Sequence, residues 1–301
     1  MVSYIHRGVL APLAFLAAAV AAPSAALAIP AASGPAFPHP NLSTADVLAI
    51  ARVPAPPGGV GLIVHADFPH ERPLVVDGVA FHALTVDLPP GGGVTIRNAV
   101  PARATRIEAD GPTGECTDPT FTATGPRWAA ASLPIAWTFH AGSVPRAVAP
   151  ARAAGALRRA HRAWPQALTS CRNPAANGFE FAYHGRAPAW VGYDGVNTVD
   201  FGKLGSKALA VNYTWYTKSA RIIEVDLRFN RYAYRWTARD RPSQRYQIRN
   251  VATHEVGHQL GLDDLTDPHG ALTMFGRIGA GELKKTTLGK GDLKGASLLS
   301  P

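Results

Sequence analysis

The sequence predicts an α+β fold for residues 113–301, preceded by a small β-rich leader region at residues 58–112. Two observations carry this prediction. Residues 222–229 (IIEVDLRF) alternate apolar with polar side chains, which is the two-residue period of a half-buried strand. Apolar side chains recur every three or four residues through 151–168, as in a helix with one buried face. Both periods within one stretch of chain favour a sheet packed against helices.

The leader region consists of short apolar runs separated by clusters of Gly and Pro, a pattern typical of short β-strands joined by turns. The runs occupy residues 60–64, 74–76, 83–88 and 94–96. None of them carries a recognisable catalytic motif. The region is therefore expected to be either a propeptide or a permanent N-terminal domain.

The first half of the α+β domain supplies most of the expected sheet. Besides the strand at 222–229, strands are expected at 133–140, 196–201 and 208–213. Pro165 should end or kink the helix predicted over 151–168, because proline removes a backbone donor and clashes with the preceding turn.

The second half of the domain predicts two further helices. One is expected over residues 244–260, with Ser243 as its N-cap and Gly261 as the residue that ends it. A last short helix is expected to start near Asp292 and to cover 293–299.

Residues 1–28 have the features of a secretory signal peptide. His6 and Arg7 form a short polar start, residues 9–22 are apolar, and the small residues at 26–28 (ALA) provide a cleavage site. The alternative is an uncleaved membrane anchor, although the prolines and the alanine-rich composition make a weak spanning helix. We expect a secreted, extracellular protein.

Composition narrows the class of protein further. Residues 29–57 are rich in Ala and Pro and predict a linker. Apolar residues make up 47% and charged residues 17% of the chain, which indicates a globular rather than a disordered protein. The net charge of +9 comes from scattered basic residues and not from a nucleic-acid-binding module. We expect no nucleic-acid partner, and no stable membrane insertion after the signal is removed.

The motif that carries chemistry is His254-Glu255-Val256-Gly257-His258, followed by Gly261 and Asp264. His254 and His258 are four residues apart, so a helix places both imidazoles on one face, where they can reach one metal ion. Glu255 stands beside the first histidine, where its carboxylate can contact a metal-bound water. Gly261 permits a sharp turn out of the helix, which can bring a third ligand beneath the metal.

Three residues compete for the position of third ligand. Asp264 lies ten residues after His254, where that ligand is expected. Asp263 is one residue out of register, and His269 lies beyond Pro268. Asp264 is therefore the preferred ligand. The alternative to a metal site is a surface helix with two incidental histidines.

Met274 is the only methionine besides the initiator, and it lies ten residues beyond Asp264. A turn that contains methionine underlies the metal in one class of zinc peptidases. The alternative is a core methionine that fills a gap in the packing. Its position just after the ligand motif favours the Met-turn.

Together, the motif of residues 254–264 and Met274 resemble the metzincin zinc endopeptidases. More narrowly, they resemble secreted, matrixin-like bacterial metalloproteases, and an aspartate as third ligand resembles snapalysin. The resemblance covers residues 115–301 and is strongest over 249–276. It implies a metzincin-like catalytic domain: a twisted mixed sheet, an active-site helix, a Met-turn and a C-terminal helix. Similar segments lie at 116–118, Trp128, 194–197, 201–202, 224–230 and 287–292.

The resemblance also implies the chemistry. The ion would be one catalytic Zn²⁺ held by His254, His258 and Asp264, because two imidazoles, a carboxylate and an open position suit a catalytic zinc site. A zinc-activated water would hydrolyse the peptide bond, with Glu255 as general base. Substrate would lie extended along an edge strand, which residues 208–213 resemble.

Other candidate sites concern the cysteines and calcium. Cys116 either pairs with Cys171 in a disulfide or caps zinc as a thiolate in a latent precursor; the even number of cysteines and the export signal favour the disulfide. Asp194, Asn197 and Asp200 could bind Ca²⁺, or they could simply stabilise a turn. The turn is the preferred interpretation.

The sequence thus predicts a secreted zinc endopeptidase that acts on proteins or peptides as a monomer. The alternative is a secreted binding protein on a metzincin scaffold with a non-catalytic zinc site. The presence of Glu255 favours the enzyme, because a structural zinc site needs no carboxylate beside an open position.

Overall fold

The computed structural model describes residues 60–67, 69, 74–76, 79–81, 83–88, 95–98, 114–204 and 208–301. The chain divides into two compact units, residues 1–32 and 33–301, and every described residue belongs to the second. The predicted signal peptide (1–28) and linker (29–57) lie outside the described residues. No helix within the described ranges is long and apolar enough to cross a membrane.

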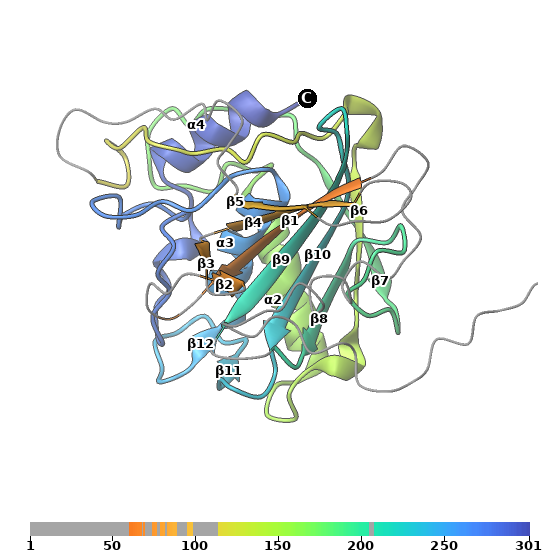
Figure 1. Ribbon diagram of the computed structural model, residues 1–301. Helices are drawn as coiled ribbons and strands as arrows, with labels where there is room; N and C mark the ends of the chain where they lie inside the picture. Colours follow the sequence, from red (N-terminus) through yellow and green to blue (C-terminus); the bar gives the residue numbers. More distant parts are fainter. Residues whose placement is uncertain are drawn as a thin grey trace, which may run out of the picture. The chain divides into compact units, whose positions relative to one another are not determined.

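One mixed sheet organises the described chain (Figure 1). Its eight strands follow the order β5-β4-β1-β9-β10-β8-β6-β7. The pairs β10–β8, β8–β6 and β6–β7 are parallel, and the remaining pairs are antiparallel. Their bounds are β1 Val60–Asp67, β4 Ala83–Leu88, β5 Thr95–Asn98, β6 Ile135–Phe139, β7 Phe181–Arg186, β8 Thr198–Gly202, β9 Ala210–Thr217 and β10 Ile222–Asn230.

Smaller elements complete the architecture. Two short strand pairs are present: β2 Leu74–Val76 with β3 Val79–Phe81, and β11 Trp236–Thr237 with β12 Tyr246–Gln247. The helices are α2 Pro150–Ala163, α3 Ile248–Gln259 and α4 Lys290–Leu299, with 3₁₀ turns at Ala130–Ser132, Ala141–Ser143 and Lys284–Thr286. The α+β prediction for the domain is confirmed.

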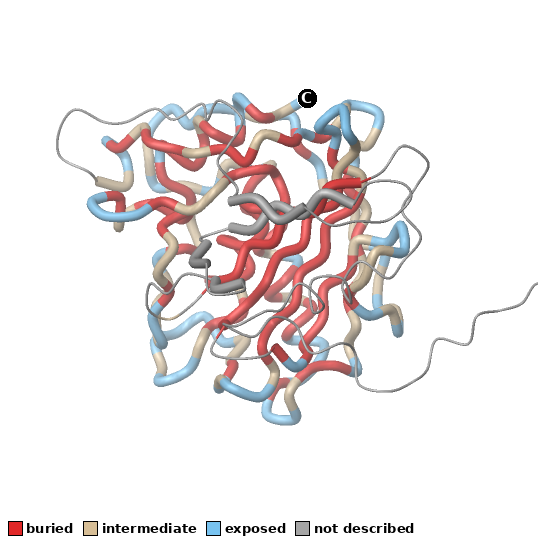
Figure 2. Tube along the Cα trace, in the orientation of Figure 1, coloured by how far each residue is buried: buried red, intermediate tan, exposed pale blue. Residues whose placement is uncertain are grey.

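The first strand of the leader region lies inside the sheet. β1 pairs antiparallel with β9 from Val60↔Thr217 to Asp67↔Ala210, and on its other side with β4. All eight residues of β1 are buried (Figure 2). The leader is therefore joined to the α+β domain by a continuous backbone ladder, which no periodicity within residues 58–112 could reveal.

Helices α2 and α3 pack together on one face of the sheet (Figure 1). Alanines 153, 156 and 160 recur along the buried face of α2, so its backbone approaches its neighbours closely. Aromatic rings of the sheet, including Phe201 and Phe229, fill the space beneath. This core fixes the position of α3.

The helix boundaries correct one prediction. α2 ends at Ala163, just before Pro165, as expected. α3, however, begins at Ile248 rather than at 244, and the cap is the side chain of Gln247, which accepts the Asn250 N–H. Ser243 was therefore the wrong cap, because the residues before α3 pair as strand β12 instead.

Candidate metal centre

Helix α3 carries the motif into the interior. Every residue of the helix except Arg249 is buried, and His254, Glu255 and His258 have no exposed surface. The two histidines are one turn apart, and their Nε2 atoms lie 3.2 Å from each other. Three ionisable side chains in a fully buried helix need partners to offset the loss of hydration.

The turn after α3 brings Asp264, the predicted third ligand, back toward the two histidines. Gly261 has φ +97°, and a Cβ there would lie 2.9 Å from the Pro126 carbonyl oxygen, so only glycine fits. Asp264 follows, with Oδ1 3.2 Å from His254 Nε2 and 3.6 Å from His258 Nε2.

The two competing ligands have other partners. Asp263 Oδ1 lies 3.3 Å from His65 Nε2, and His269 Nδ1 lies 2.8 Å from Asp118 Oδ2. Of the three carboxylate or imidazole candidates, Asp264 is the one that the fold places in the cluster.

A fourth side chain comes from the leader. Asp67, the last residue of β1, places Oδ1 3.2 Å from His254 Nε2 and Oδ2 3.7 Å from His258 Nε2. Ligand atoms of Asp67, His254, His258 and Asp264 all lie within 4.8 Å of one another. Sequence reasoning missed Asp67, because a single aspartate 187 residues from its partner carries no local signal.

Backbone carbonyls orient both imidazoles. His254 Nδ1 lies 2.7 Å from the Thr273 oxygen, and His258 Nδ1 lies 3.0 Å from the Leu262 oxygen. A carbonyl can only accept, so each Nδ1 carries a proton and donates it. Each Nε2 is thereby turned toward the cluster, which is the arrangement that metal-binding histidines require.

The cluster fits a divalent cation. Within the described structure, Asp67 Oδ2, Asp264 Oδ1 and both Glu255 carboxylate oxygens are buried and accept no hydrogen bond. Ligand atoms about 2.0–2.2 Å from a tetrahedral ion lie about 3.3–3.6 Å apart. The distances of 3.2, 3.6 and 3.7 Å among the imidazole and carboxylate atoms match this spacing.

The carboxylates of Asp67 and Asp264 favour a positive charge in the cluster. Burial disfavours charge on His254, yet Asp67 and Asp264 outweigh burial and raise its pKa to about 9. Burial, assisted by His65, lowers the pKa of His258 to about 4. A single proton on His254 cannot satisfy two carboxylates and a second imidazole at once, whereas a metal ion that replaces this proton can.

The Met-turn lies beneath this cluster and is held from both sides. Met274 is buried, and Asp292 in α4 accepts the N–H groups of Thr273 (2.8 Å) and Met274 (3.0 Å). The buried ammonium of Lys285 donates to the carbonyls of Thr273 (2.8 Å) and Phe275. The Thr273 carbonyl also orients His254, so Lys285 and Asp292 position the cluster indirectly. Neither residue was predicted from the sequence.

Glu255 lies beside the four side chains of this cluster. Its pKa is raised well above the usual value, first by burial and second by the charge of Asp67. A carboxyl group in this environment takes up a proton readily.

The three candidate calcium ligands bond to the protein itself. Asp194 accepts the Val196 N–H at 2.9 Å, Asn197 accepts the Val225 N–H at 2.7 Å, and Asp200 pairs with buried Arg228 at 2.8 Å. These contacts are those of a turn and a buried ion pair.

Cys116 and Cys171 form a disulfide with a Cα–Cα distance of 5.2 Å. The bond leaves Cys116 no thiolate to offer to a metal ion.

A comparison with protein-family models identifies the family of this chain. The family model described as Matrixin matches residues 128–299, more than half of the chain. The match includes α3, Asp264 and Met274 but not the leader strand with Asp67. A search of curated proteins finds no match. The chain belongs to the matrixin family of metalloproteases.

Proposed function

We propose that this matrixin is a secreted zinc-dependent endopeptidase in which His254, His258 and Asp264 hold the zinc ion. The observation that carries the proposal is the convergence of two oriented Nε2 atoms on buried carboxylate oxygens that lack a hydrogen-bond donor. A divalent cation is the simplest partner for all of them.

Glu255 would act as the general base. Zinc bound in the cluster would polarise the scissile carbonyl and acidify a water molecule. Glu255 would accept the proton of that water and return it to the departing amine, a role that suits a carboxyl group with a raised pKa. The lack of a donor on both Glu255 oxygens leaves them available for this transfer.

Substrate would bind along β9. This strand includes most of residues 208–213 and lies directly above α3, where Asn212 Nδ2 contacts the Glu255 carbonyl at 3.4 Å. β9 is not the edge strand expected from the sequence, because β1 and β10 pair with its two sides. With β1 removed, an extended peptide could add to β9 through backbone hydrogen bonds. The four side chains of the cluster come from one chain, so a monomer would suffice for activity on proteins or peptides.

The proposed organisation follows the sequence analysis. Residues 1–28 would be the signal peptide, 29–57 a linker, 58–112 a propeptide and 113–301 the catalytic domain. The disulfide agrees with export to an oxidising compartment. Zinc would suffice without calcium, because the candidate calcium ligands bond to other groups of the protein.

The test compares full-length wild type with Glu255→Gln, before and after limited proteolysis of the leader. Casein hydrolysis and zinc content are measured for both. We expect Glu255→Gln to keep one zinc ion and to lose at least about 100-fold in rate. If proteolysed wild type keeps zinc and leaves casein intact, the alternative of a binding protein with a non-catalytic zinc site is favoured.

A further inference from the structure

We infer that Asp67 is a fourth protein ligand of the metal centre and that strand β1 fills the substrate groove, so the intact chain is latent. This inference rests on the proposed function and names the regulation of the same site. It concerns a residue that lies outside the Matrixin match.

Asp67 gives the cluster one protein donor more than a catalytic zinc site uses. A catalytic zinc site has three protein ligands and one position that is open to water or substrate. Here Asp67 brings a fourth donor, 3.2 Å from His254 Nε2 and buried completely. With Asp67 bound, the open position is taken by the chain itself.

The backbone ladder of β1 occupies the side of β9 that a substrate peptide would need. Both sides of β9 are hydrogen-bonded, one to β10 and the other to β1 over eight residue pairs. The ladder continues to the end of the strand, where the Leu209 N–H donates to the Asp67 carbonyl at 2.7 Å. A substrate peptide cannot pair with β9 while β1 remains there.

The contacts of His65 and Asp67 fix the register of β1 on the sheet. His65 and Asp67 are two residues apart on the strand, so both point to the face that carries α3. The ring of His65 stacks on His258 at 4.0 Å with an interplanar angle of 11°, and its Nε2 lies 3.3 Å from Asp263. A slip of one residue would turn both side chains away from the metal centre.

The disulfide excludes a cysteine as the group that caps the metal. The chain has two cysteines, and both are used in the Cys116–Cys171 bond. No thiolate remains to cap the metal, so a carboxylate is the group that can do so.

The experiment compares three full-length proteins: wild type, Asp67→Ala and Asp87→Ala. Asp87→Ala is the control, because it removes the same negative charge from β4. Each protein is loaded with zinc, and binding of acetohydroxamate, a small metal ligand, is measured by calorimetry. We expect Asp67→Ala to bind it about tenfold or more tightly than wild type, because the fourth position is open, and Asp87→Ala to match wild type. Cobalt-substituted Asp67→Ala should also show an altered visible absorption spectrum.

The outcomes separate the two proposals. If wild type binds acetohydroxamate as tightly as Asp67→Ala, the inference is overturned, whatever the enzyme does. A second outcome is that Asp67→Ala binds acetohydroxamate more tightly, but wild type from which the leader has been removed by limited proteolysis does not cleave casein. In that case Asp67 stands as a ligand and the endopeptidase proposal fails.

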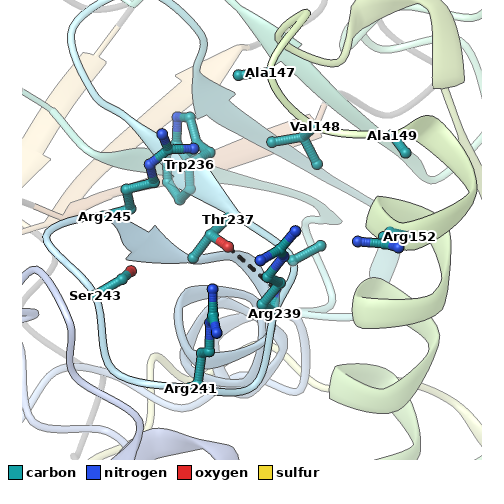
Figure 3. Close-up of a pocket in the computed structure, with 11 residues that line it drawn as sticks. Ala147, Val148, Ala149, Arg152, Trp236, Thr237, Arg239, Arg241, Ser243 and Arg245 are labelled. Atoms are coloured by element: carbon teal, nitrogen blue, oxygen red, sulfur yellow. Dashed lines mark hydrogen bonds between the residues drawn. The ribbon is translucent and has the colours of Figure 1, made fainter.

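A second inference rests on a separate cavity of about 480 Å³ near the start of α2 (Figure 3). Four arginines line it: Arg152 from the first turn of α2, and Arg239, Arg241 and Arg245 from the loop between β11 and β12. No acidic residue is among its lining residues. The structure assigns this cavity to a multiply charged phosphate or sulfate.

The positive charge of the four arginines is not balanced by acidic residues in the cavity lining. The one acidic residue of the loop, Asp240, is not among the lining residues and contacts Gln247, Arg159 (3.3 Å) and Arg249 (3.7 Å) instead. Among the described residues, the four lining guanidinium groups have no ion-pair partner. Guanidinium groups match oxyanions in geometry as well as in charge, and such a gathering of like charge is stabilised by a bound anion.

Calorimetry with inorganic tripolyphosphate and with sulfate tests this site and distinguishes the two chemistries. The pocket variant Arg241→Ser/Arg245→Ser is compared with Arg162→Ser/Arg172→Ser, which removes the same charge elsewhere. We expect the pocket variant to weaken binding about tenfold or more, and the control to stay near wild type. Equal losses in both variants, or no binding of either anion by wild type, would overturn the inference.

Discussion

Met274 packs so closely against Gly257 that a single added carbon on Gly257 would overlap its sulfur. The same carbon would lie 2.8 Å from the ring of Trp164. Gly257 stands directly before His258, so the turn at Met274 supports α3 at the point where the helix carries its two histidines. The relationship gives Met274 a physical role beyond filling the core.

Gly257→Ala should therefore be destabilising despite the higher helix propensity of alanine. Overpacking against Met274 and Trp164 predicts a loss of about 1–3 kcal/mol in the free energy of unfolding, measured with urea. Gly155→Ala in α2 is the matched control, because its added carbon meets only Arg159 at an ordinary 3.5 Å. The control should gain about 0.5–1 kcal/mol. Equal effects of the two substitutions would contradict this explanation.

Lys285→Met should weaken metal binding. Burial lowers the pKa of Lys285 to about 8, and its ammonium holds the Thr273 carbonyl that orients His254. Loss of such a supporting contact lowers metal affinity by about 10- to 100-fold. Chelator competition measures the zinc affinity, and Lys284→Met, on the exposed neighbour, is the control. Unchanged affinity in Lys285→Met would show that the Met-turn keeps its shape without the ammonium.

Removal of the disulfide should lower stability without ending the proposed latency. The bond links residues 55 positions apart, and the entropy of a loop of that length predicts a loss of about 4 kcal/mol for Cys116→Ser/Cys171→Ser. Urea unfolding measures the loss. If the variant instead binds acetohydroxamate more tightly than wild type, a cysteine takes part in latency after all.

His161 should make the fold sensitive to acid. Burial lowers its pKa from 6.5 to about 4, so between these values the unfolded chain binds a proton that the folded chain does not. The contribution of neutral His161 is present above pH 6.5 and is lost as the pH falls toward 4, at a cost of about 3 kcal/mol.

His161→Phe isolates this effect. Phenylalanine keeps an aromatic ring against Trp137, which His161 stacks on at 3.9 Å, but it cannot be protonated. The free energy of unfolding of the variant should fall less steeply than that of wild type between pH 6.5 and 4. Parallel profiles would exclude His161 as the source of the acid sensitivity.

The secondary structure was predictable where its signal is local. The strand at 222–229 and the end of the helix before Pro165 follow from residue periods and proline chemistry. The start of α3 could not be predicted from the sequence, because Tyr246 and Gln247 pair with residues ten positions earlier in β11. Strand β7 was also missed, since its residues are half-exposed and lack a regular alternation.

The candidate metal centre likewise has residues that local sequence predicts and residues that only the fold reveals. The sequence by itself determined that His254 and His258 share one helix face beside Glu255, because four residues make about one helical turn, and it predicted Asp264 near them through the turn at Gly261. Only the tertiary structure separated Asp264 from Asp263 and His269, whose partners His65 and Asp118 are far away in the chain. Asp67, Lys285 and Asp292 reach the centre through sheet pairing and helix packing. Such long-range contacts depend on the whole fold and have no local sequence signal.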